Sequence, residues 1–125
     1  MKSVTIRHRP LLLVEDNPDV REAIRTLLSL EGYMVVTANN GEHALTALRS
    51  GLQPCLIILD LAMPGTDGYQ FRSEQMRDAS IADIPVIICS GTRDVADAAE
   101  TLGVAGYYHK PIEVEEFLDL VARHC

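Results

Sequence analysis

Four consecutive aliphatic residues, Leu56–Leu59, run directly into Asp60, and this stretch constrains the fold more than any other. A half-exposed strand would alternate apolar and polar residues, so the unbroken apolar run predicts a strand that is buried on both faces, as at the centre of a parallel sheet. Asp60 follows where this strand leaves the core, and a carboxylate there costs free energy unless it is paired. The sequence therefore singles out Asp60 as the candidate chemical centre.

Apolar runs and segments with helical periodicity alternate five times along the chain. The runs predict strands over 11–14, 34–38, 56–59, 85–89 and 106–109, and helices are expected between Asn17 and Gly32 and over 42–50, 68–78, 95–102 and 114–123. The third helix has the weakest pattern, because Gln75 stands where the stripe would need an apolar residue. The alternation predicts an α/β fold, a doubly wound five-stranded parallel sheet between helices in a flavodoxin-like (βα)5 three-layer sandwich, with strand order 2-1-3-4-5.

Length and composition set the class of protein. With 125 residues, 47% of them hydrophobic, the chain is expected to form one domain over 10–125 after a short tail over 1–9. A net charge of -7 argues against direct binding of nucleic acid, which needs clustered Lys and Arg. No apolar run is long enough to span a membrane and the start lacks the apolar region of a signal peptide, so the cytoplasm is the expected location.

The cysteines and histidines suggest no metal centre of their own. The spacing of Cys55, Cys89 and Cys125 is not that of metal ligands. The spacing of the histidines is not that of metal ligands either. Cys55 and Cys89 flank or lie in predicted strands and are expected to be buried as small apolar residues. A disulfide framework is not expected in a chain of this size and location.

Polar residues follow the predicted strands at the ends that should meet. Glu15 and Asp16 follow the first strand, Asp60 the third, Ser90 the fourth and Lys110 the fifth. In a doubly wound sheet these ends lie on one edge, where ligands bind at the point at which the strand order reverses. Three carboxylates that meet raise one another's pKa unless a cation joins them, and Mg²⁺ (or Mn²⁺) fits such oxygen ligands best.

A cation site, a lysine and a hydroxyl beside a carboxylate favour phosphoryl transfer. The metal and Lys110 would neutralise charge on the phosphoryl oxygens, and Asp60 is a competent nucleophile that would form an aspartyl-phosphate. Ser90 could then hydrogen-bond the new phosphate.

Four pieces of the sequence together resemble the receiver domain of bacterial two-component response regulators, over about residues 10–125. They are Leu-Leu-Val-Glu-Asp-Asn-Pro at 12–18, Leu-Asp-Leu-Ala-Met-Pro-Gly-Thr-Asp-Gly at 59–68, Ser-Gly at 90–91 and Lys-Pro at 110–111. The resemblance implies a phosphorelay switch in which Asp60 takes a phosphoryl group from a sensor histidine kinase or a histidine phosphotransfer protein. Such a protein catalyses only its own phosphorylation and dephosphorylation, and is not otherwise an enzyme.

The resemblance also implies roles for the other residues. Asp16 would bind Mg²⁺ directly and Glu15 through water, the backbone carbonyl of Ala62 would be the third protein ligand, and Lys110 would pair with the phosphate. The family usually has a cis peptide before Pro111, and Ser90 and Tyr107 match its switch pair. Ala62 is smaller than the family's common side chain there, which leaves the phosphate lifetime open, and Gly91 replaces a common Ala.

The expected output is a changed contact between proteins. Phosphorylation would alter the face made by the fourth helix, the fifth strand and the fifth helix, towards a downstream target that the sequence does not name. We expect a monomer or a weak homodimer that binds neither nucleic acid nor membrane.

Three other functions fit less well. A haloacid-dehalogenase-like phosphatase would need a second Asp at position 62, which is Ala, and a flavodoxin-like redox module would need a phosphate-binding loop where Glu15 and Asp16 stand. A receiver-like binding module that works without phosphorylation is disfavoured because all the site residues are present.

Overall fold

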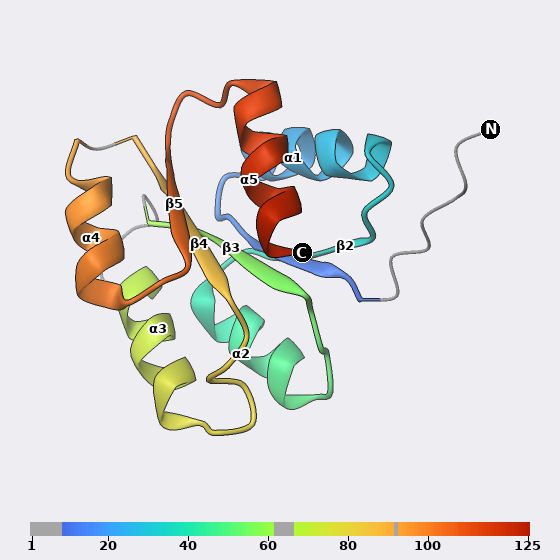
Figure 1. The fold of residues 1–125 in the computed structure, drawn as a ribbon. Helices are drawn as coiled ribbons and strands as arrows, with labels where there is room; N and C mark the ends of the chain where they lie inside the picture. The colour runs from blue at the N-terminus through green and yellow to red at the C-terminus, as the bar shows by residue number, and fades with distance from the viewer. Residues whose placement is uncertain (1–8, 62–66, 92) are drawn as a thin grey trace.

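The computed structural model describes residues 9–61, 67–91 and 93–125, in which strands and helices alternate along the chain (Figure 1). The elements are β1 (Leu11–Val14), α1 (Pro18–Leu30), β2 (Val35–Ala38), α2 (Gly41–Arg49), β3 (Leu56–Asp60), α3 (Asp67–Arg77), β4 (Val86–Ser90), α4 (Val95–Leu102), β5 (Gly106–His109) and α5 (Val114–His124). All the strand pairs are parallel, and the sheet has the order β2-β1-β3-β4-β5. The predicted fold class and strand order are confirmed.

Short polar side chains begin the first two helices, as N-cap residues do elsewhere. The Asn17 side chain accepts hydrogen bonds from the amides of Asp19 and Val20, and Asn40 does the same for His43. Gly103 ends α4 in the left-handed region, at φ 63°, which favours glycine. These caps fix where each helix starts or stops relative to the strand before it.

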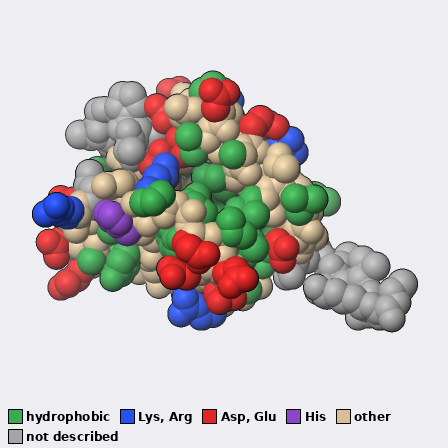
Figure 2. Space-filling model, turned by 90° about the horizontal axis from the view of Figure 1, so that it is seen from above, with side chains coloured by type: hydrophobic (Ala, Val, Ile, Leu, Met, Phe, Trp, Pro, Cys, Tyr) green, Lys and Arg blue, Asp and Glu red, His purple; other side chains and the backbone are tan. Residues whose placement is uncertain are grey.

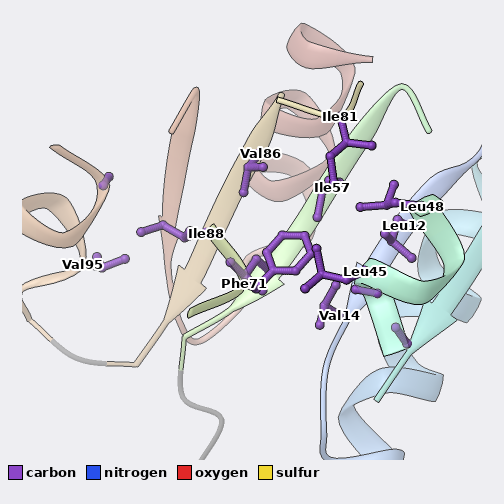
Figure 3. Packing of buried hydrophobic residues seen from close by; sticks show 14 residues of the cluster. Leu12, Val14, Leu45, Leu48, Ile57, Phe71, Ile81, Val86, Ile88 and Val95 are labelled. Carbon is purple, nitrogen blue, oxygen red and sulfur yellow. The ribbon is translucent and has the colours of Figure 1, made fainter. Parts of the chain in front are cut away.

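The sheet is buried on both faces. Figure 1 shows α1 and α5 on one face and α2 and α3 on the other, and α4 adds Val95 and Ala99 to the core on the α2–α3 side. All five residues of β3 are buried, as the apolar run predicts. Figure 3 shows the ring of Phe71 lying among strand and helix side chains of this core, close to Leu45 and Val14. Burial of this kind contributes about 2 kcal/mol or more for each large apolar side chain.

The helix with the weakest pattern, α3, does form, with a polar residue inside. Phe71 supplies its main apolar contact, and Met76 points to solvent. Gln75 is fully buried in the place where the periodicity calls for an apolar side chain. Hydrogen bonds make this possible, because a buried amide is costly only when its polar atoms are unpaired.

The expectation about the cysteines is wrong for one pair. Cys55 and Cys125 form a disulfide, with Cα atoms 5.2 Å apart and a sequence separation of 70 residues. The packing of α5 brings its last residues beside the residue that precedes β3, which spacing along the chain does not reveal. Cys89 is a free buried thiol, as expected.

The net charge of the chain is -7, and the face drawn in Figure 2 shows no single dominant charged patch. On the face shown in Figure 2, Asp and Glu side chains are scattered and Lys and Arg side chains do not gather together, consistent with the net charge of -7. Within the described ranges, every helix is too short or too polar to cross a bilayer.

Candidate metal and phosphoryl site

The register of the sheet brings the predicted polar residues to one edge. Val14 is level with Leu59, so Glu15 follows β1 where Asp60 ends β3. Asp60 is level with Cys89, and Ser90 is level with His109, which places Ser90 and Lys110 at the same edge. We call this edge the carboxyl edge and the opposite one the amino edge.

Three carboxylates converge at the carboxyl edge. Glu15, Asp16 and Asp60 each place one oxygen so that the three oxygens lie within 4.8 Å of one another. Glu15 is 2% exposed and Asp60 is 4% exposed. Asp16 is only partly buried, so the cluster is open to solvent on the side of Asp16. Three hard oxygen donors at this spacing fit a small divalent cation such as Mg²⁺ or Mn²⁺.

Lys110 reaches into the cluster from β5. Its Nζ lies 3.3 Å from Glu15 Oε1 and 3.4 Å from Asp60 Oδ2. Its backbone amide donates to the carbonyl oxygen of Ser90 at 2.8 Å, which continues the β4–β5 pairing beyond the strands. The Lys110–Pro111 peptide is cis, as the family resemblance implies.

The charges of the cluster change its titration. Burial, a hydrogen bond to Asp60 and the negative charge of Asp60 raise the pKa of Glu15 to about 7, although Lys110 and the Asn17 amide act the other way. For Lys110, burial alone lowers the pKa of the ammonium, but the charges of Asp60 and Glu15 outweigh it and the pKa is raised. The protein therefore holds Lys110 as a cation next to more negative charge than it can neutralise.

The start of α1 positions Glu15. The backbone amide of Asn17 donates to Glu15 Oε2 at 3.3 Å, and Arg21 Nη1 donates to the Glu15 carbonyl oxygen at 3.0 Å. The same Asn17 caps the helix, so the acidic pair and the helix start are placed by one turn. This explains why the Glu-Asp-Asn-Pro order at 15–18 carries more information than two acids alone.

The remaining predicted site residues differ in their surroundings. Ser90 is buried at the end of β4, whereas the Tyr107 side chain is 48% exposed on β5. The neighbouring Tyr108 is the buried tyrosine, with its ring edge-on to Phe117 and its hydroxyl donating to the Glu113 carbonyl oxygen. Ala62, whose carbonyl is an expected metal ligand, lies outside the described residues.

One buried polar group, which lies away from the carboxyl edge, is not predicted from the sequence. Arg72 on α3 is buried beside Gln75 and reaches the end of α4. The only signal in the sequence is the pair of polar residues three apart, in the helix whose apolar stripe is interrupted.

Comparison with known proteins now identifies the fold's family. A model of the family described as "Response regulator receiver domain" matches residues 11–122. Among curated proteins, the chain is 38% identical to a probable transcriptional regulator, ycf27, of Guillardia theta, over 85% of this chain and 41% of that protein. It is 34% identical to the DNA-binding dual master transcriptional regulator RpaA of a Synechocystis strain, over 86% of this chain and 45% of that protein. The chain thus spans less than half the length of these relatives.

Solved structures agree in fold. TrrA from Thermotoga maritima, solved in complex with Mg²⁺ and BeF, aligns with a TM-score of 0.82 at 29% identity, over 94% of this chain and 99% of that one. The phosphorylated cyanobacterial phytochrome response regulator RcpA aligns with a TM-score of 0.75 at 29% identity, over 91% of this chain and 89% of that one. With the family match over most of its length, the chain belongs to the response regulator receiver domains of two-component systems.

Proposed function

We propose that this domain accepts a phosphoryl group on Asp60 from a phosphohistidine of a sensor histidine kinase or a histidine phosphotransfer protein, in a reaction that needs Mg²⁺ or Mn²⁺. The observation that carries the proposal is the convergence of Glu15, Asp16 and Asp60 with Lys110 at one edge of the sheet. Acceptance of a phosphoryl group is general to the receiver family, and the assignment to Asp60 rests on this geometry.

The transfer itself exchanges one bond for another. A carboxylate oxygen of Asp60 attacks phosphorus in line with the P–N bond of the donor. The P–O bond forms as the P–N bond breaks, and the imidazole leaves with the electron pair and takes up a proton. Asp60 ends β3 on a rigid strand, so its carboxylate approaches with little loss of conformational freedom.

The acidic side chains would hold the cation. Asp16 and Asp60 would bind it directly, Glu15 through water, and the Ala62 carbonyl is the further protein ligand that we assign. When bound, the cation supplies positive charge to the phosphoryl oxygens. Lys110, already paired with Asp60 at 3.4 Å, would move to a phosphoryl oxygen once the carboxylate is phosphorylated.

Phosphorylation would be read out as a change in contact between proteins. The phosphoryl group carries a charge of about -1.5 to -2 at neutral pH and replaces the single negative charge of the carboxylate. Ser90 would turn its hydroxyl to the phosphate and the exposed Tyr107 ring would turn inward, which changes the face of α4, β5 and α5. The domain would act as a switch that catalyses only its own phosphorylation and dephosphorylation, with no direct contact to nucleic acid or membrane.

The whole protein's partners are a further part of the proposal. The relatives are transcriptional regulators about twice as long as this chain, and the DNA binding named for RpaA belongs to that whole protein. We assign residues 10–125 to the receiver domain and 1–9 to a tail, in a cytoplasmic monomer or weak homodimer.

Intact-mass measurement after incubation with acetyl phosphate tests the proposal. We expect one phosphoryl adduct that requires Mg²⁺ and is absent in Asp60→Asn. Asp119→Asn makes the same chemical change at an exposed position on α5 and should retain the adduct. An adduct that persists in Asp60→Asn would overturn the assignment of the acceptor.

A further inference from the structure

Arg72 is a buried guanidinium on α3 that bonds to neutral oxygens. It is 7% exposed. Its Nε donates to the Leu102 carbonyl oxygen at 3.0 Å, its Nη2 to the Gly103 carbonyl oxygen at 2.8 Å, and its Nη1 to Gln75 Oε1 at 2.7 Å. Within the described residues it forms no ion pair with a carboxylate. A buried charge held in this way needs a structural reason, because desolvation opposes it.

The acceptors supply that reason, because two of them end a helix. Leu102 is the last residue of α4 and Gly103 is its C-cap. The last carbonyl groups of a helix have no partner within it and carry the negative end of its dipole, which a cation stabilises. The planar fork of arginine can reach both carbonyls and a third acceptor together, which a lysine ammonium cannot reproduce in this geometry.

Gln75 ties the same arginine to the rest of α3. Its Oε1 accepts from Arg72, and its Nε2 donates to the carbonyl oxygens of Ile81 and Ile84, each at 3.0 Å. The amide thus joins the segment that leads into β4. We call this hydrogen-bonded group the Arg72–Gln75 anchor, and it holds the C-terminal end of α4 to α3.

The other end of α4 is held by apolar packing and has no side-chain cap. Its N-cap, Asp94, makes no side-chain hydrogen bond to the helix, and both Arg93 and Asp94 are exposed. Val95, the first residue of the helix, and Ala99 are buried in the core, so this half is held by non-directional apolar contacts and not by directed hydrogen bonds like those of Arg72. This N-terminal end is also the end nearer in sequence to Ser90 and the carboxyl edge. The two ends of α4 are therefore unequal, with the fixed end away from the chemistry.

We propose that Arg72 is a positioning residue that makes the C-terminal end of α4 the pivot of that helix, so that events at Asp60 and Ser90 displace its N-terminal end. This inference rests on the proposed function, which supplies the event at Asp60. An eight-residue helix is about 12 Å long, so a tilt of about 10° about its fixed end moves the other end by about 2 Å. A small change at the site would thereby become a directed change in the α4–β5–α5 face.

Amide hydrogen exchange can follow each end of α4 separately. The amides of Gly103 and Val104 donate to carbonyls of the last turn of α4, and the amide of Ala98 donates to Asp94 in its first turn. Exchange is measured by NMR with the protein empty and loaded with Mg²⁺ and beryllofluoride. The variants are Arg72→Met and the milder Arg72→Lys, which keeps the charge. Arg77→Met is the matched control, since Arg77 lies on the same helix but is exposed.

In the wild type and in Arg77→Met, loading should change the exchange of Ala98 and leave Gly103 and Val104 unchanged. In both Arg72 variants, Gly103 and Val104 should exchange about tenfold faster when empty, and they should now respond to loading as well. The response to loading is the decisive quantity, because a purely structural bond would speed exchange equally in the two states.

Three results overturn the pivot. One is an increase in the exchange rates of Gly103 and Val104 that is equal in the empty and loaded Arg72 variants. Another is no increase in these exchange rates. The third is a wild type that binds beryllofluoride but responds to it equally at both ends of α4. A wild type that takes neither beryllofluoride nor a phosphoryl group from acetyl phosphate instead overturns the proposed function, and the pivot falls with it.

Discussion

The two edges of the sheet are built for different purposes. At the carboxyl edge, Glu15, Asp16 and Asp60 gather around Lys110, which leaves excess negative charge in a buried place. At the amino edge, the Cys55–Cys125 disulfide joins the start of β3 to the end of α5. There Arg9 also donates to the carbonyl oxygens of Gln53 and Pro54. One edge gathers like charges that oppose stability, and the other adds stability about one strand length away.

The largest effect expected is at the amino edge. A bridge across 70 residues restricts the unfolded chain, so opening it should lower the free energy of unfolding by about 4 kcal/mol. Urea denaturation of the oxidised protein, with and without a reductant, measures the loss. The Cys55→Ser/Cys125→Ser variant should match the reduced protein and not respond to reductant.

Mg²⁺ binding by the same cysteine variant tests whether the two edges are independent of each other. A five-residue strand spans about 16 Å, so the amino edge should not influence the carboxylates. Mg²⁺ affinity should be the same with the disulfide open or closed. A large change in affinity would break the comparison between the edges.

At the carboxyl edge we expect removal of a charge to stabilise the metal-free protein. The pKa of Glu15 rises from 4.5 to about 7 on folding, so the folded state holds this proton where the unfolded state has lost it. The stability that the protonated group contributes is complete below pH 4.5 and is lost as the pH rises through about 7. The total amounts to about 3 kcal/mol.

Glu15→Gln removes this titration. The free energy of unfolding of the variant relative to the wild type, measured in a chelator, should therefore increase between about pH 5 and pH 8. Added Mg²⁺ should offset the loss in the wild type. A difference in the free energy of unfolding that does not change with pH would show that folding does not raise the pKa of Glu15.

A smaller effect is expected at Lys110. Lys110→Met keeps the apolar stem but removes the cation that faces Glu15 and Asp60, which should lower the stability of the metal-free protein by about 2 kcal/mol. Mg²⁺ should still bind, because the lysine is not a ligand, while the phosphorylated protein should signal poorly. Isothermal titration with Mg²⁺ measures the binding. Loss of binding in this variant would contradict the role assigned to Lys110.

The carboxyl edge was the part of the molecule most accessible from sequence. Buried strands appear in the sequence as apolar runs, and parallel strands end at a common edge of the sheet. The positions of Glu15, Asp60 and Lys110 therefore follow from where each run ends. The register of the sheet and the contacts of Lys110 bear out that geometry. The roles of these residues in phosphoryl transfer remain predictions.

Interactions between distant surface elements could not be read in the same way. The Cys55–Cys125 bridge depends on where the last turn of α5 lies over the sheet, and helical periodicity fixes a buried face but not that position. The Arg72–Gln75 anchor depends on the approach of α3 to the end of α4. In both cases the sequence contains the residues, but only the tertiary packing determines which groups they contact.

The most direct test of the account is to locate the phosphoryl group chemically. Borohydride reduces an aspartyl phosphate to homoserine, and peptide mass spectrometry then identifies the residue. After incubation with acetyl phosphate and Mg²⁺, we predict homoserine at position 60 alone, and none when Mg²⁺ is withheld. Modification at Glu15, Asp16 or any residue away from the carboxyl edge, with Asp60 intact, would contradict the account.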